Sequence, residues 1–360
     1  MPDNSIYISV DGKKFTGWTD VKISKSLETL TSSFELTATD KHLPDRNQDW
    51  LLRPQDECII SVGTEVLLTG YIDKLIPSVS KDSHTIKIIG RDKTSDIVDC
   101  SYTESKSSFS KVTMYTLIQK LVEPFGLTVK KDSSVSDTEK FQFTVNKNDS
   151  IFNNLNKKAN DLGILLITNS SGEIVLTNSG DATIDDVLEY GDNVESATVT
   201  YDYTNRFSEY IVNAQSLYKQ SKGNWGTNIK ITATSEDEGI KRYRPKLIKP
   251  NSPLSRTLAQ KRANWEALIR SAKSQLINVT IPGFRTRGGV LWDLNKLVDV
   301  LIPPLYINPT VALLITAVEF SLSSSGTFTK MTLKRPDAYT SEPGRKISKV
   351  SNSLGWDRLG

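Results

Sequence analysis

The sequence has 360 residues, of which 37% are hydrophobic and 24% are charged, a balance typical of a protein that folds around apolar cores. This length allows two or three domains, each large enough to bury a core of its own. The net charge of +3 is too small to indicate nucleic-acid binding by itself, and no apolar run reaches the roughly 18 residues of a membrane-spanning helix.

The N-terminal region has the pattern of short strands. Its first residues, MPDNSIYISVDG, lack a basic start followed by an apolar stretch, which predicts that the protein has no signal peptide and is made in a cytoplasm. Apolar and polar residues alternate over 5–40 and again over 57–73 and 85–92. So many short strands would leave exposed edges in a flat sheet, whereas a closed or nearly closed barrel would cover them. We therefore expect a first β-barrel domain over residues 1–101.

A phrase from this region recurs near the C-terminus. EVLLTGYID (65–73) is followed by TIKIIGRD (85–92), and ALLITAVEF (312–320) is followed by FTKMTLKRPD (328–337). The comparison places Thr69 opposite Thr316, and each unit ends in an arginine, Arg91 or Arg335. We infer two related β-units within one chain.

Residues 102–186 have a helical period instead. Apolar residues recur at helical spacing from Met114 to Phe125, and Gly126 can end that helix. Ser150 is the expected N-cap of a second helix, which Gly163 ends. Short strands follow each helix, so this stretch predicts a small α/β domain.

The β pattern resumes after this domain. We assign residues 187–340 to a second β-barrel domain, interrupted by an inserted loop and helix over about 219–278. Residues 341–360 are polar with few apolar anchors and are expected to form a mobile tail. The predicted fold class is α+β, mainly β, with two related β-barrel hub domains and an intervening small α/β domain.

The chain carries none of the common catalytic motifs: it has no Walker loop, no GxSxG elbow and no HExxH pair. The two histidines, His42 and His84, are expected at the surface, and Cys58 and Cys100 are expected to be free thiols. A pair of carboxylates for glycoside hydrolysis stays open among 42 acidic residues, although none lies in an aromatic-rich context. We expect no enzymatic activity, no metal and no cofactor.

One strongly basic stretch, IKRYRPKLIKP, has two interpretations. It can contact a phosphate backbone or an acidic partner, or it can be an ordinary basic surface loop. Its cationic residues lie on both sides of Tyr243 and are Lys241, Arg242, Arg244, Lys246 and Lys249.

Segments spread along the whole chain carry a resemblance to a known family. The chain resembles the tail protein P family, the baseplate hub proteins of contractile-tailed phages of the Mu kind. More distantly it is similar to the protein D late-control family and to the hub of type VI secretion spikes. The segments that carry it include FTGWTDVKISKSLE (15–28), GRDKTSDIVDCS (90–101), LIQKLVEPFGL (117–127), RFSEYIVNAQS (206–216) and GGVLWDLNKLVDV (288–300). The most specific of them are GRDKTSDIVDCS and the GVLWDLNKLVDV part of the last.

This resemblance implies a structural protein of the virion tail baseplate. It implies a homotrimeric ring to which each subunit gives two similar β-barrels, so that six barrels join the six-fold tail tube to the three-fold central spike. The implied partners are two further copies of the chain, the spike protein, and the tail tube or other baseplate proteins. A transient contact with DNA passing through the lumen is a further expectation, and no membrane anchor is expected.

Two other functions stay open at this point. The same fold can serve as the hub of a tailocin or of a secretion-type spike. A baseplate cell-wall hydrolase is the alternative from another functional class, but the resemblance leaves no spare domain for it.

Overall fold

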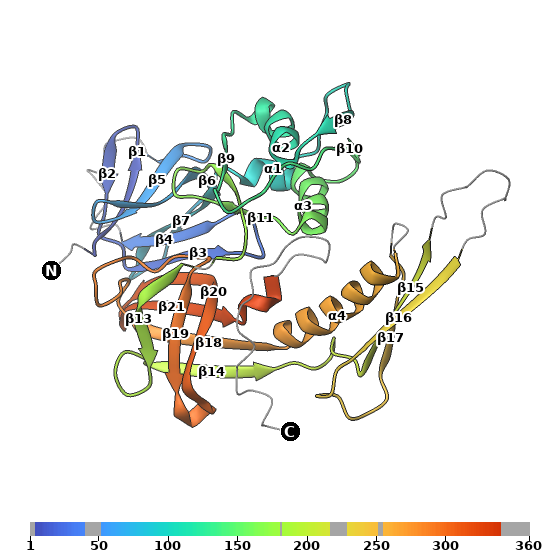
Figure 1. Ribbon diagram of the computed structural model, residues 1–360. Coiled ribbons are helices and arrows are strands. Elements are labelled where there is room, and N and C mark those ends of the chain that lie inside the picture. Colours follow the sequence, from blue (N-terminus) through green and yellow to red (C-terminus); the bar gives the residue numbers. More distant parts are fainter. Residues whose placement is uncertain (1–3, 40–51, 181, 217–228, 251–254, 340–360) are drawn as a thin grey trace.

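The computed structural model describes residues 4–39, 52–180, 182–216, 229–250 and 255–339 (Figure 1). Strands predominate in this part of the chain, which confirms the prediction of a mainly β protein. His42, the expected mobile tail 341–360 and part of the expected insertion lie outside the described residues. No helix of the described residues is long and apolar enough to cross a membrane.

The first β-unit is antiparallel throughout. Its alternating sequence places one face of each strand in the core, as in the strand of Phe34 and Leu36, both buried. The turn at Asp11 and Gly12 has positive φ at both residues, as expected for a two-residue hairpin. The strands are β1 (Ile6–Val10), β2 (Lys13–Phe15), β3 (Asp20–Ser26), β4 (Ser33–Thr39), β5 (Glu57–Val62), β6 (Glu65–Val79) and β7 (His84–Asp92).

The second β-unit has six strands from the C-terminal half of the chain. They are β13 (Thr183–Glu189), β14 (Ser196–Tyr201), β18 (Gln275–Pro282), β19 (Leu297–Ile302), β20 (Ile307–Ser323) and β21 (Gly326–Lys334). All of their pairings are antiparallel except that of β13 with β19, which is parallel.

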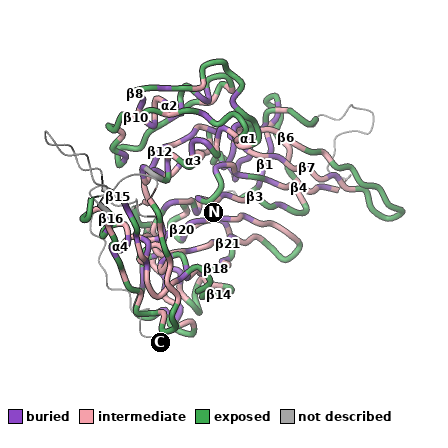
Figure 2. Tube along the Cα trace, turned by 90° about the vertical axis from the view of Figure 1, so that its right-hand side faces the viewer, coloured by how far each residue is buried: buried purple, intermediate pink, exposed green. Residues whose placement is uncertain are grey.

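The two units share one sheet. Strand β3 pairs with β20, which joins the units into a 13-stranded sheet whose main path runs β14-β18-β21-β20-β3-β4-β7-β6-β5-β1-β2. Figure 2 shows this succession of strands from β7 to β14. Among the described residues, the pairings of neither unit close into a complete barrel. Barrel closure was expected to cover the free edge of β3. Strand β20 of the other unit covers this edge instead.

A single hydrophobic core lies beneath this shared sheet. It includes buried residues of both units, such as Ile23 and Phe34 from the first and Val279 and Phe320 from the second. The rings of Phe284 and Phe320 meet edge to face with centroids 5.6 Å apart. Buried residues of both units therefore belong to one continuous hydrophobic cluster.

The two units have the same strand order, although β1 runs antiparallel to β5 whereas its counterpart β13 runs parallel to β19. The order β3-β4-β7-β6-β5-β1 in the first unit corresponds to β14-β18-β21-β20-β19-β13 in the second, and the strands also follow the same order along the chain. Both long strands carry a bulge against their hairpin partner, at Asp73 in β6 and at Thr316 in β20. The internal repeat inferred from the sequence is therefore present as a repeated strand order.

The residue alignment of that repeat was wrong by four positions in the first strand of each pair and by one position in the second. The bulges place Asp73, not Thr69, opposite Thr316, and the hairpin register then places Arg91 opposite Lys334 instead of Arg335. Inward and outward positions alternate every two residues, so an even shift preserves the hydrophobic pattern of a strand. The bulges fix the register, and the sequence pattern alone does not reveal them.

A small α/β region with its own core follows the first unit. As predicted, Ser150 caps a helix that ends at Gly163, and Gly126 adopts a left-handed conformation just after the preceding helix and a short 3-10 turn, η2 (Glu123–Phe125). The elements are α1 (Ser95–Asp99), β8 (Ser108–Val112), α2 (Met114–Val122), β9 (Val129–Lys131), β10 (Phe141–Thr144), α3 (Ile151–Leu162), β11 (Leu165–Thr168) and β12 (Ile174–Thr177).

A three-stranded sheet and a long helix are inserted between β14 and β18, in the place that the short turn between β3 and β4 occupies in the first unit. These elements are β15 (Glu209–Ser216), β16 (Ile229–Glu236), β17 (Pro245–Ile248) and α4 (Arg256–Lys273). Ala259 and Ala263 on α4 are fully buried against this small sheet, because small side chains let the helix approach closely. Figure 1 shows the insertion projecting away from the shared sheet.

Candidate assembly surfaces

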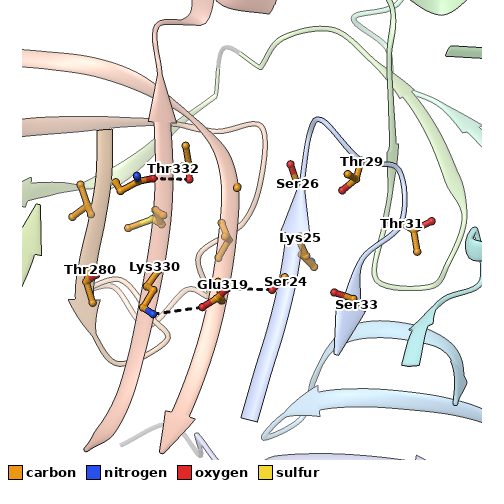
Figure 3. A pocket seen from close by; sticks show the side chains of 15 residues that line it. Ser24, Lys25, Ser26, Thr29, Thr31, Ser33, Thr280, Glu319, Lys330 and Thr332 are labelled. Carbon is orange, nitrogen blue, oxygen red and sulfur yellow. Dashed lines mark hydrogen bonds and ion pairs between the residues drawn. The ribbon is translucent and has the colours of Figure 1, made fainter. Parts of the chain in front are cut away.

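The junction of the two units carries a network of charged and small polar side chains on its outer face. Glu319 of β20 lies 3.0 Å from the amine of Lys22 on β3 and 3.7 Å from that of Lys330 on β21. Ser24 donates a hydrogen bond of 3.5 Å to the same carboxylate, and Figure 3 shows Glu319 between Ser24 and Lys330. The network connects three neighbouring strands across the junction.

A shallow hollow lies over this junction. It is lined by Ser24, Lys25, Ser26, Thr29, Thr31, Ser33, Asn278, Val279, Thr280, Ala317, Val318, Glu319, Lys330, Met331 and Thr332. Glu319 is the single carboxylate of this lining, and two lysines neutralise it. The rest of the lining is mainly serine, threonine and small apolar residues, with no histidine or cysteine among the residues that line the hollow.

A second contact across the junction comes from Lys25. Its side chain is only 9% exposed, and its amine lies 3.2 Å from a carboxylate oxygen of Asp293 in the loop before β19. A nearly buried lysine requires such a partner. This ion pair therefore helps to hold β3 against the second unit.

Asp92, at the end of β7, joins the first β-unit to the α/β region. It is 1% exposed and accepts hydrogen bonds from the Ser32 amide at 2.6 Å, the Thr94 amide at 2.9 Å and the Thr94 hydroxyl at 2.5 Å. The Thr94 hydroxyl also lies 3.2 Å from that of Thr168 on β11. Burial raises the pKa of the Asp92 carboxyl, and the hydrogen bonds oppose this shift.

Arg91, next to Asp92, connects strand and helix. Its guanidinium lies 2.7 Å from Asp73 of β6 and 2.8 Å from Asp99 at the end of α1. The segment GRDKTSDIVDCS is thus a structural connection between two regions. Cys100, within it, is an exposed free thiol, whereas Cys58 is buried.

The five basic residues singled out in the sequence lie in and around β17, and they do not form one site. Lys241, Arg242 and Lys249 are exposed, and Tyr243 between them is 87% exposed. Arg244 and Lys246 are half-buried and pack over the ring of Phe207, each at 5.3 Å from its centroid. The segment therefore divides into an exposed group and a group held against the protein.

Sequence reasoning missed the groups that position this segment. Arg270 of α4 also lies over Phe207, at 5.7 Å, so three cations surround one ring. Arg206, beside it, makes a buried two-point ion pair with Asp237 at 2.6 and 2.8 Å. These contacts join parts of the chain about 30 to 60 residues apart. The residues around Arg206 and Phe207 in the segment RFSEYIVNAQS therefore do not predict them.

Three family models match the chain in succession. They describe the N-terminal domain of the Mu phage baseplate assembly protein GpP-like family over residues 5–92, the second domain of gp44-like baseplate hub proteins over 94–178, and the fourth domain of GpP over 255–342. The chain is also 30% identical to the baseplate hub protein gp44 of Escherichia phage Mu, with 98% of this chain and 94% of that protein covered. The chain belongs to the family of Mu-like phage baseplate hub proteins.

Solved structures agree with this membership in the Mu-like hub family. A 43 kDa tail protein of the prophage MuSo2 from Shewanella oneidensis is 28% identical, with a TM-score of 0.79 over 93% of this chain and 99% of that chain. A tail protein from Neisseria meningitidis shares the fold at 22% identity, with a TM-score of 0.75 over 93% and 98% of the two chains.

A more distant likeness extends to secretion systems. An Escherichia coli component of the type VI secretion system has a TM-score of 0.55 at 11% identity, over 93% of this chain and 79% of that chain. At this identity the likeness shows a common fold, so the hub fold is shared between phage tails and secretion machinery.

Proposed function

We propose that the protein is the structural hub of a contractile phage-tail baseplate, made in the host cytoplasm and working in the virion. In this proposal three copies form a ring that adapts the six-fold tail tube to the three-fold central spike. The observation that carries it is the repeated strand order, because a threefold ring of duplicated units presents six similar surfaces.

The proposed domain division follows from this role. Residues 1–101 and 187–340 are the two β hub domains, with the insertion at about 219–278 in the second, and 102–186 is the α/β domain between them. The continuous core beneath both β-units supports a subunit that transmits force as one body.

The proposed partners are the spike protein on one side of the ring and the tail tube or other baseplate proteins on the other. The exposed group of the basic segment, Lys241, Arg242 and Lys249, is proposed to contact an acidic partner or DNA passing through the lumen. Its exposure supports this assignment, whereas Arg244 and Lys246 serve to hold β17 against Phe207.

Light scattering of the purified protein tests the ring. We expect a mass three times that of the 40.1 kDa chain. A protein that stays monomeric at every concentration, even with the spike protein present, contradicts the proposal.

A structural and non-enzymatic role is part of the same proposal. The family models account for three successive segments with baseplate domains, which supports it over a cell-wall hydrolase. A zymogram with cell-wall substrate is expected to show no clearing, and clearing by the purified protein would contradict it. Neighbouring genes for a capsid and terminase would distinguish a phage hub from a tailocin or secretion hub.

A further inference from the structure

Strand β3 joins the two units by pairing with the distal half of β20. The equivalent edge in the first unit, on the distal half of β6, is open among the described strands. In the second unit, the distal half of β20 pairs with β21 on one side and, over residues 317–322, with β3 on the other. In the first unit, the distal half of β6 pairs with β7 over residues 74–79, while β5 pairs only with residues 65–71. Among the described strands, none pairs with the other edge of β6 beyond Tyr71.

The partner strand shows the same imbalance. β3 pairs with β4 on one side and with β20 on the other. Its counterpart β14 pairs with β18, and no other described strand pairs with it. The outer edge of β14 and the edge of the distal half of β6 that faces away from β7 are therefore open among the described strands.

The repeated strand order allows the two open edges to be matched residue by residue. The bulges match Val318, Phe320 and Leu322 of β20 with Leu75, Pro77 and Val79 of β6. In the same way, β18 and β21 place Ile277 at the position of Phe34, so Val199 of β14 corresponds to Ile23 of β3. Since Phe320 pairs with Ile23, Pro77 is matched with Val199.

The exposure of these residues shows that the two open edges lack a covering strand. Phe320 and Val318 are 0% and 1% exposed at the joined edge, whereas Val79 at the open edge is 78% exposed. Pro77 is also exposed, although its position in the strand faces the core side. On the other edge Tyr201 is 44% exposed, while its counterpart Lys25 is 8% exposed. Apolar residues in core-facing positions at an open strand edge are a template for strand addition.

We propose that β14 of one copy adds to the distal half of β6 of the next copy, antiparallel and in the register of β3 on β20. This inference deepens the proposed ring and rests on it, since it names the edges through which the copies join. The register pairs Leu75 with Tyr201, Ile76 with Thr200, Pro77 with Val199, Ser78 with Thr198 and Val79 with Ala197. It also brings Lys74 opposite Asp202, which adds a pair of opposite charges.

The proline at position 77 is compatible with this arrangement. A proline lacks the amide N–H of a ladder bond and is found at sheet edges, where it hinders indiscriminate strand pairing. The edge of β6 would therefore accept one strand of complementary shape at the cost of one hydrogen bond. Repeating a head-to-tail contact of this kind generates a closed ring when its rotation fits the number of copies.

Disulfide trapping tests the register. The double variant Ile76→Cys with Thr200→Cys places two cysteines directly opposite each other across the proposed contact, with Cα atoms about 5 Å apart. Within one chain the two positions are seven strand spacings apart along the sheet from β6 to β14, about 34 Å at the usual strand spacing, which disfavours an intrachain bond. Exposed Cys100 is replaced by serine in this background, and Cys58 is retained because burial raises its pKa to about 12.

The matched control is Ile76→Cys with Ser196→Cys, on the same strands and the same face but displaced by about 13 Å. We expect mild oxidation of the trimer to convert most of the first variant into cross-linked dimer and trimer and the control into little of either. A trimer in light scattering that does not cross-link through the first pair, or that cross-links equally through both, overturns this contact but leaves the ring. A protein that is monomeric throughout, with no cross-link, overturns the contact and the ring together.

Discussion

Replacing Asp92 by alanine is expected to weaken the connection between the first β-unit and the α/β region. The variant leaves the amides of Ser32 and Thr94 without an acceptor, since both donate to the Asp92 carboxylate in a buried site. The Thr94 hydroxyl keeps alternative partners in Thr31 and Thr168, each at 3.2 Å. Each buried donor left unpaired costs about 1–3 kcal/mol, so the expected loss in unfolding free energy is about 3 kcal/mol.

Urea unfolding followed by circular dichroism measures this loss, with Asp96→Ala as the control. Asp96 is an exposed residue of the same segment, and its replacement should change the unfolding free energy by no more than about 0.5 kcal/mol. If Asp92→Ala costs as little as the control, the buried carboxylate does not hold this connection and the reasoning is refuted.

Three further predictions concern charged residues. Arg206→Ala leaves the buried Asp237 carboxylate unpaired and should cost about 3–5 kcal/mol in urea unfolding, and a loss no larger than that of exposed Arg242→Ala would contradict this. Hydrogen bonding from Lys334 lowers the pKa of Glu28 in the folded protein, so its contribution to stability is present above about pH 4.5 and is lost as the pH falls through the folded pKa. Thermal unfolding should therefore show a smaller acid-induced loss for Glu28→Gln than for the natural protein, and parallel pH profiles would rule the pair out as a cause. Charge reversal of the exposed basic group uses the substitutions Lys241→Glu, Arg242→Glu and Lys249→Glu. The variant should reduce particle yield or infectivity without lowering the melting temperature. Unchanged yield and infectivity would make this segment an ordinary surface loop.

Local structure was predictable where neighbouring residues decide it. Ser150 and Gly163 mark the ends of α3 because the cap hydrogen bond and the left-handed stop involve residues within one helical turn. The hairpin turn at Asp11 and Gly12 is equally local. The alternation of residues 65–73 and 312–320 also predicted two similar strand pairs, since one face of each strand is buried.

Contacts between distant segments were not predictable in the same way. The pairing of β3 with β20 joins residues almost 300 positions apart, and it replaced the separate closed barrels expected from edge exposure. The register of the repeat depended on two bulges, each of which adds one residue to its strand and shifts the alternation beyond it. The cations around Phe207 come from β17 and α4, so no spacing in the sequence relates them.

The most direct test of the proposed hub is an averaged electron-microscope image of the purified protein, viewed along the axis of the assembly. Three copies, each with two β-units of the same strand order, predict a closed ring with six similar lobes around a central lumen. An assembly without six lobes, such as an open filament or a two-fold dimer, would contradict the central claim.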